Sequence, residues 1–110
     1  MTTRQGGAAP RTVTWTAQAL VDLEEIGSRI ERDDPPAAAR WIGKLLAAGE
    51  KAGAFPLAGR KVPELDRDDV RERIVGNYRV VYWLRDEQLE VVTVFEGHRL
   101  PTLRVPTRRR

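Results

Sequence analysis

The spacing of the hydrophobic residues changes once along the chain, and this change restricts the folds that the chain can adopt. From Ala17 to Ala52, apolar residues recur every three or four positions, which is the spacing of one face of an amphipathic helix. From Arg71 to Phe95, apolar and polar residues tend to alternate, as they do in half-buried strands. The intervening segment, Phe55–Asp69, is interrupted by Gly and Pro and is expected to be a loop.

The helical part divides at the sequence Asp33-Asp34-Pro35-Pro36. Thr16 is a predicted N-cap for a first helix that begins at Ala17. Asp34 is a predicted cap for a second helix, and Pro35 suits its first position because the amide hydrogen that proline lacks would have no helical partner there. Two amphipathic helices with so short a junction predict an antiparallel helical hairpin.

The remaining elements are predicted strands. They are 13–15, 71–75, 78–85 and 89–95, with turns at Gly76-Asn77 and at Asp86-Glu87-Gln88. The order is strand, helix, helix, strand, strand, strand, which predicts an α+β fold. In that fold the last three strands form an antiparallel meander, and the helical hairpin packs on one face of the sheet.

Composition excludes several classes of site. The chain has 110 residues, no Cys and one His, so it is one domain without disulfides, cysteine nucleophiles or cysteine-bound metals. A single His makes a histidine-built metal site improbable, and we expect no metal and no cofactor. No apolar run approaches the roughly 20 residues of a membrane span. We therefore expect a cytoplasmic protein with no membrane partner and no signal peptide.

The positive charge is concentrated at the two ends. Residues 13–96 contain 12 basic and 16 acidic residues, whereas the residues on either side contain seven arginines and no acid. We expect a flexible basic flank at 1–12, a folded domain at 13–103 and an Arg-rich tail at 104–110. Short arginine tails usually provide solubility or weak attraction to polyanions, so the basic isoelectric point is weak evidence for a nucleic-acid partner.

The sheet face opposite the helices is a candidate binding surface. Alternation places Arg71 and Arg73 on one side of their strand, and Arg79 and Arg85 on one side of theirs. If both pairs point away from the helices, four guanidinium groups line a surface suited to phosphate or carboxylate. The alternative is that these arginines are the solvated side of a half-buried sheet.

Two more residues are candidates for chemistry. Metal-free cleavage of RNA needs a base for the 2′-hydroxyl, cations for the phosphate and an acid for the leaving oxygen. Glu64, the strand arginines and His98 supply these groups, provided that the loop and the strand ends converge. The alternative is that Glu64 and His98 are ordinary surface residues.

Four local patterns in a fixed order resemble a known family. They are Trp15–Ile26 (WTAQALVDLEEI), Asp34–Trp41 (DPPAAARW), Phe55–Glu64 (FPLAGRKVPE) and Tyr78–Tyr82 (YRVVY), and the chain continues to Glu96-Gly97-His98-Arg99. Together they resemble the RelE/ParE superfamily of bacterial type II toxin–antitoxin toxins, from about Val13 to Leu103. The resemblance implies a growth-inhibiting toxin whose open sheet face and helical hairpin are wrapped by an antitoxin.

The resemblance leaves two targets open. ParE-like members poison DNA gyrase, and DPPAAARW and GRKVPE look more like that branch, which we slightly favour. RelE-like and YoeB-like members cut mRNA on the ribosome, and here Glu64, Arg79 and His98 match the carboxylate, arginine and histidine of YoeB-like nucleases. Arg99 stands where those enzymes have tyrosine, and the lysine-rich surface of RelE is missing. A third alternative is a relative that binds antitoxin but is no longer toxic.

The resemblance also implies a partner surface. We expect an acidic, amphipathic antitoxin segment to bind the exposed sheet face and part of the hairpin, in a toxin–antitoxin hetero-oligomer. The expected contacts with antitoxin or target are Arg71, Arg73, Arg79, Trp83, Arg85 and Arg99. Trp15 and Trp41 are further candidates, with core packing as the alternative, which we favour for Trp41.

Overall fold

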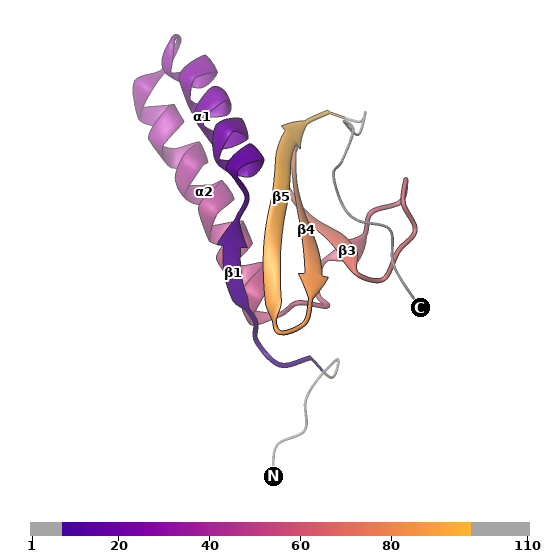
Figure 1. The fold of residues 1–110 in the computed structure, drawn as a ribbon. Helices are drawn as coiled ribbons and strands as arrows, with labels where there is room; N and C mark the ends of the chain where they lie inside the picture. The colour runs from indigo at the N-terminus through magenta and orange to yellow at the C-terminus, as the bar shows by residue number, and fades with distance from the viewer. Residues whose placement is uncertain (1–7, 98–110) are drawn as a thin grey trace.

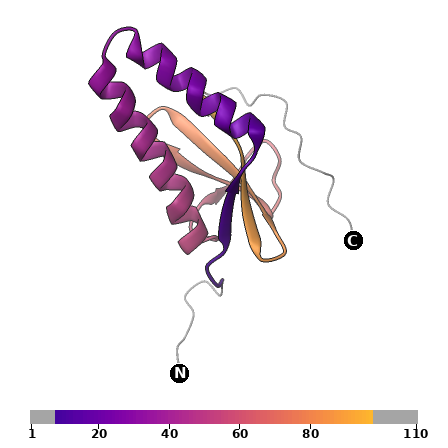
Figure 2. The ribbon, with the colours of Figure 1, turned by 60° about the vertical axis from the view of Figure 1, so that its left-hand side comes forward.

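Two helices lie side by side on one face of a five-stranded sheet (Figure 1). The computed structural model describes residues 8–97. In chain order the elements are β1 (Thr12–Trp15), α1 (Ala17–Glu31), α2 (Pro35–Ala54), β2 (Arg60–Lys61), β3 (Val70–Val75), β4 (Tyr78–Arg85) and β5 (Gln88–Glu96). Figure 2 shows the helical hairpin from its outer side, with the strands behind it. The predicted α+β fold is confirmed.

The helix ends form where the sequence predicts them. The Thr16 hydroxyl accepts a hydrogen bond from the Ala19 backbone N–H at 3.0 Å and begins α1. The Asp34 carboxylate accepts one from the Ala37 N–H at 3.2 Å and begins α2. Each cap satisfies a backbone donor that has no partner inside the helix.

The sheet has the order β1-β5-β4-β3-β2. The antiparallel meander of β3, β4 and β5 is confirmed. The structure adds two features: β1 pairs with β5 in parallel, so the sheet is mixed, and the two-residue strand β2 lies inside the segment expected to be a loop. A two-residue strand is too short to show a hydrophobic period, which is why the sequence gives no sign of it.

The main core lies between the hairpin and the sheet. It combines buried residues of both helices with those of β4 and β5: Ala19, Leu23, Ile26, Leu45, Ala48, Ala52, Tyr78, Val80, Tyr82, Leu89, Val91 and Val94. Trp15 and Trp41 pack against this core, as the core-packing alternative expects. Trp41 makes an edge-to-face contact with Tyr78, with the ring centroids 5.4 Å apart.

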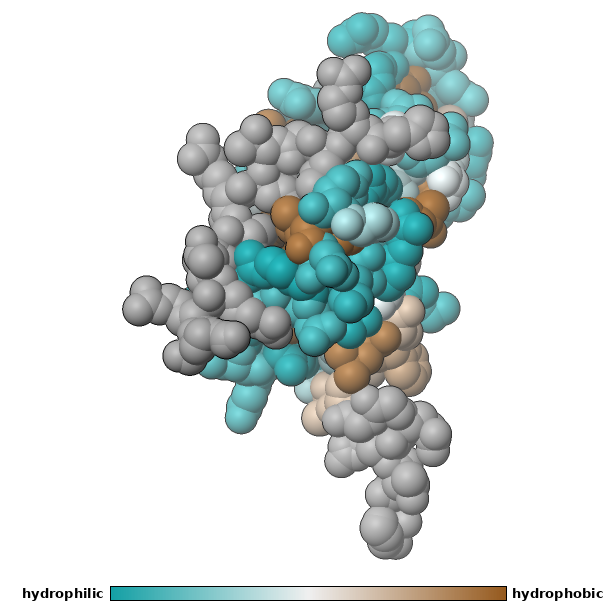
Figure 3. All heavy atoms as spheres, turned by 90° about the vertical axis from the view of Figure 1, so that its right-hand side faces the viewer, coloured by the Kyte–Doolittle hydropathy of each residue, from teal (hydrophilic) through white to brown (hydrophobic). Residues whose placement is uncertain are grey.

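A second, smaller core lies on the opposite face of the sheet. Val62 is fully buried against Val70 and Val81, and Leu65 and Trp83 pack around them. Because Val62 and Leu65 belong to the segment between α2 and β3, this segment covers part of the face that was expected to be open. The residues described on that side are mostly hydrophilic, with small apolar areas between them (Figure 3).

The described residues begin inside the expected N-terminal flank of 1–12. Arg11 is anchored there, because its backbone N–H donates to the Gly53 carbonyl at 2.8 Å and its side chain donates to the Asp86 carbonyl at 2.6 Å. The last residues of this flank therefore pack against α2 and the turn between β4 and β5. The expected tail at 104–110 lies outside the described residues. Among residues 8–97, neither helix is both long and apolar enough to cross a membrane.

Two glycines of α2 provide a matched test of the packing between β1 and the hairpin. A Cβ at Gly43 would meet no atom within 4 Å, whereas a Cβ at Gly53 would lie 2.9 Å from the Arg11 carbonyl oxygen and would clash with Val13. Gly43→Ala should raise the free energy of unfolding by about 0.5–1 kcal/mol through helix propensity. Gly53→Ala should lower it by roughly 1–3 kcal/mol, because β1 must move. Urea denaturation of both variants measures the difference, and equal effects would contradict this packing.

Candidate functional site

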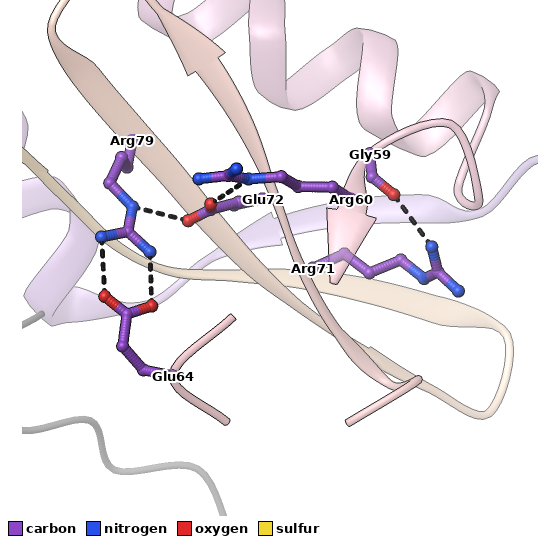
Figure 4. A network of polar contacts seen from close by, with 6 residues as sticks. All are labelled: Gly59, Arg60, Glu64, Arg71, Glu72 and Arg79. Atoms are coloured by element: carbon purple, nitrogen blue, oxygen red, sulfur yellow. Dashed lines mark hydrogen bonds and ion pairs between the residues drawn. The ribbon is translucent and has the colours of Figure 1, made fainter. Parts of the chain in front are cut away.

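The guanidinium of Arg79 is the centre of a polar network on the sheet face turned away from the helices (Figure 4). Its Nη1 and Nη2 donate to the two carboxylate oxygens of Glu64, at 3.0 and 2.8 Å. Its Nε donates to Oε1 of Glu72 at 2.7 Å. The ring of Phe95 lies 4.9 Å from the guanidinium carbon. Arg79 is therefore held by two carboxylates and an aromatic ring, and only 8% of its side chain is exposed.

The carboxylate of Glu72 joins two arginines. Its side chain is completely buried, and its Oε2 accepts a hydrogen bond from Nε of Arg60 at 2.6 Å. Each guanidinium that contacts Glu72 uses its Nε atom for that bond. A buried carboxylate is tolerated when charged donors satisfy its oxygens, which is the arrangement here.

Strand register brings these side chains together. Glu72 pairs with Val81, and Ile74 pairs with Arg79, so Glu72 and Arg79 are diagonal neighbours on the same face of β3 and β4. Arg60 reaches Glu72 because the two residues are paired across β2 and β3. Glu64 arrives from the loop that follows β2. The network thus depends on three strands and one loop that are separated in the sequence.

Hydrogen bonds from Arg79 lower the pKa of Glu64 from 4.5 to about 2. Backbone hydrogen bonding and the positive charges of Arg79 and Arg60 contribute to this same shift, while partial burial opposes it. The same contact with Glu64 raises the pKa of Arg79, and Glu72 adds to this effect. Both members of the pair are therefore charged throughout the physiological pH range.

The structure brings together two of the three predicted catalytic residues. Glu64 and Arg79 are adjacent, but they bind each other in a bidentate contact. A carboxylate with a pKa near 2 is a weak general base, because the best catalytic pKa lies near the working pH. His98, the predicted acid, lies outside the described residues, as does Arg99.

The condition for a row of four arginines is not met, because the structure divides the four between the two faces of the sheet. Arg71 pairs with Tyr82 and Arg73 with Val80, and both partners belong to the core under the helices. Since paired residues project from the same face, Arg71 and Arg73 project toward the helix side. Arg71 donates there to the Gly59 carbonyl at 2.9 Å. Within each strand, alternation correctly predicted which arginines share a side. The register between β3 and β4 was needed to tell whether the two pairs of arginines share a face of the sheet.

Arg85 and Trp83 lie on the same face as Arg79. The Arg85 guanidinium lies 4.6 Å from the Trp83 ring centroid, and Arg85 also forms a loose ion pair with Glu90 at 3.8 Å. The indole N–H of Trp83 donates to Asp69 at 3.1 Å. Hydrogen bonds from Arg67 are the main reason that the pKa of Asp69 is lowered. Trp83 is thus fixed by the loop before β3.

Sequence reasoning missed Glu72 and Arg60. The available signal for Glu72 is its position: it alternates with Arg71 and Arg73, so it shares a side of β3 with Val70, which is apolar. An acid at an inward strand position requires a cationic partner. Arg60 carries no comparable signal, because it lies in the two-residue strand that the sequence does not predict.

A second concave surface lies along the helical hairpin. It is a groove of about 720 Å³ between α1 and α2. Its α2 wall consists of Pro35, Ala38, Ala39, Ile42, Gly43 and Leu46, while α1 contributes Leu23, Glu24, Gly27, Ser28 and Glu31. Leu46 is 40% exposed. Within residues 8–97, no three His, Asp or Glu side chains are grouped as a metal ion would require.

Sequence comparisons with family models and with known proteins show similarity between this chain and toxins. Residues 13–101 match the model described as the ParE toxin of the type II toxin–antitoxin system parDE. The chain is 33% identical over 90 residues to the protein Y4kP of Sinorhizobium fredii, covering 80% of this chain and 90% of Y4kP. It is 31% identical over 88 residues to toxin RelE2 of Caulobacter vibrioides, covering 80% and 97% of the two chains.

Two solved structures have a similar fold. One is a chain of the chromosomal ParDE toxin–antitoxin system of P. aeruginosa, with a TM-score of 0.69, 13% identity and coverage of 80% of this chain and 97% of that one. The other is a chain of the toxin–antitoxin complex RelBE2 of Mycobacterium tuberculosis, with a TM-score of 0.60, 22% identity and coverage of 81% and 93%.

The lowered pKa of Glu64 predicts a pH-dependent difference in stability between the wild type and Glu64→Gln. The carboxylate contributes stability in full above its ordinary pKa of 4.5, and this contribution falls as the pH drops toward about 2. Urea denaturation at several pH values should therefore show that the advantage of the wild type shrinks over this interval. The comparison isolates the effect of Glu64, because Asp69, whose pKa is also lowered, is present in both proteins. A difference that stays constant between pH 5 and pH 2 would contradict the contact with Arg79.

Proposed function

Since the chain belongs to the ParE family of toxins from type II toxin–antitoxin systems, we propose that it inhibits DNA gyrase by binding, without chemistry of its own. The toxin would then act in the cytoplasm and remain harmless while an antitoxin covers it. The match over residues 13–101 is to the ParE branch of the superfamily. This agrees with the slight preference for that branch that the sequence patterns gave.

The observation that carries this proposal is the closed contact between Glu64 and Arg79. A nuclease mechanism needs Glu64 to accept a proton and Arg79 to bind phosphate. In the structure the two groups are bound to each other, because both guanidinium Nη atoms donate hydrogen bonds to the Glu64 carboxylate. A toxin that works by docking needs no free general base at Glu64.

The second candidate function is ribosome-dependent cleavage of mRNA, with Glu64 as base, Arg79 on the phosphate and His98 as acid. One observation favours it: Glu64 and Arg79 converge at one site from separate elements, as this hypothesis requires. Toxin RelE2, at 31% identity, also bears the name of the other branch. This alternative therefore has to be tested beside the first.

The groove between α1 and α2 is the surface on which we place the antitoxin. It is long, open and apolar on its α2 wall, which suits the apolar face of an amphipathic helix. The two structural neighbours come from toxin–antitoxin systems, which supports an antitoxin as the partner. The acidic segment expected over Arg79, Trp83 and Arg85 would occupy a separate surface, on the other side of the sheet.

Expression without antitoxin tests the two targets. If the toxin inhibits gyrase, growth should stop, DNA breaks should accumulate and mRNA should stay intact, and Glu64→Gln and His98→Ala should remain as toxic as the wild type at equal protein levels. Mapping mRNA 5′ ends within minutes of induction provides the measurement. Cuts in phase with translation that vanish in His98→Ala would overturn the proposal in favour of the nuclease. Normal growth with the wild type would instead indicate a relative that has lost its toxicity.

Two equally exposed leucines test the antitoxin surface. Leu46 lines the groove and is 40% exposed, whereas Leu57 lies after α2, outside the groove, and is 42% exposed. Leu46→Glu should weaken binding of the cognate antitoxin by at least about tenfold, because a charge enters an apolar contact. Leu57→Glu should leave it unchanged. Co-expression and measured affinity give the comparison, and equal affinity of the two variants would place the antitoxin elsewhere.

A further inference from the structure

The contact between Glu64 and Arg79 has the geometry of a bound ligand. Two parallel N–H···O bonds of 3.0 and 2.8 Å are the arrangement in which arginine binds an external carboxylate. The Glu64 side chain is 36% exposed and comes from a loop, whereas the Arg79 side chain is 8% exposed and comes from β4. The anion is therefore the accessible partner, and the cation is the fixed one.

Arg79 is held in place by contacts other than Glu64. Its Nε is bonded to the fully buried Glu72, which also fixes Arg60 (Figure 4). Its guanidinium packs over the ring of Phe95. These contacts come from the strands of the sheet and do not involve the loop that carries Glu64. The site is consequently organised before any external anion arrives, which reduces the cost of binding one.

The described members of the network include equal numbers of positive and negative charges. Arg60 and Arg79 carry two positive charges, and Glu72 and Glu64 carry two negative charges. Departure of Glu64 removes one negative charge from beside a largely buried guanidinium, which is costly. An external carboxylate restores the balance, so one carboxylate can replace the other without a change in the net charge of the site.

The surroundings of the site fit an extended peptide. A pocket of about 490 Å³ is lined by Arg60, Ile74, Gly76, Asn77, Arg79, Glu96 and Gly97. Its carboxylate, Glu96, forms an ion pair with Arg29 at 3.4 Å. Ile74 is 51% exposed. β2 pairs with β3 only at Arg71 and Glu72, so within residues 8–97 no strand continues this pairing beyond Glu72. An unpaired strand edge beside an exposed aliphatic residue is a site to which a peptide strand can add.

We propose that Glu64 is an exchangeable internal carboxylate, and that the Arg60–Arg79 site binds a glutamate or aspartate side chain of an extended, acidic segment of a protein partner, which displaces Glu64. The internal carboxylate then acts as a competitor that keeps the site closed until the partner binds. The proposal concerns this site alone and does not depend on the identity of the cellular target.

The test uses the full chain and a defined probe. The probe is a capped pentapeptide, Thr-Val-Glu-Val-Thr, and its analogue with Gln in place of Glu is the control. Glu64 reduces the apparent affinity for the peptide, because only the fraction of molecules in which it has left Arg79 can bind. The Glu peptide should therefore bind Glu64→Gln at least about tenfold more tightly than the wild type. The Arg79 Nε–H signal in NMR titrations reports binding at this site. The Gln analogue should bind both proteins weakly.

Two matched variants keep the test specific. Glu90→Gln removes a carboxylate that lies 3.8 Å from Arg85 and has no contact with Arg79 in the described network, so the peptide affinity should stay at the wild-type value. Glu64→Asp has a side chain one methylene shorter, which weakens its hold on Arg79 while keeping the charge. Its peptide affinity should lie between those of the wild type and Glu64→Gln. If Glu64→Gln does not fold, Glu64→Asp replaces it in the comparison with the wild type.

Several outcomes would overturn the proposal. One is an equal affinity of the Glu peptide for the wild type and for folded Glu64→Gln or Glu64→Asp, which would leave Glu64 with a purely structural role. Another is tighter binding of inorganic phosphate than of the Glu peptide to Glu64→Gln, which would point to a nucleic acid. Because the titration uses purified protein, its result does not depend on whether the toxin causes DNA breaks or mRNA cleavage in the cell.

Discussion

The buried carboxylate of Glu72 organises the face of the sheet that the helices do not cover. It lies between Arg60 of β2 and Arg79 of β4, and its side chain has no exposure to solvent. An ionised group in this position is stable only while both arginines bind it. Three strands must therefore keep their register for the network to exist, and β2, although only two residues long, is held in the sheet partly by this contact.

The two faces of the sheet differ in the kinds of contact that they carry. The helix-facing side is apolar and carries the main core, which provides most of the hydrophobic stabilisation. The opposite side combines a small core around Val81 with ion pairs and aromatic–cation contacts. Fixed charges of this kind suit a partner of complementary charge. It is poorly suited to acid–base chemistry while Glu64 is held by Arg79 at a pKa near 2.

Local signals in the sequence predicted most of the elements correctly. Thr16 and Asp34 begin the helices as expected, because capping depends on residues only three positions apart. β4 has the predicted limits, since its alternation is regular over eight residues. The candidate site was predicted only in part. Glu64 and the strand arginines were selected as the groups that RNA cleavage needs, and the family resemblance then selected Arg79 among them. Glu72 and Arg60, which hold Arg79, were missed.

The order of the elements, the helix caps and the residues of each strand that share a side follow from the amino-acid sequence alone, because each of these depends on neighbours within a few positions. Which side of one strand matches which side of the next became known only from the folded chain. That choice separated Arg71 and Arg73 from Arg79 and Arg85. It also brought Glu64 from a distant loop onto Arg79. Register between strands is set by the packing of the whole sheet against the hairpin, and a shift of one residue would exchange the two faces.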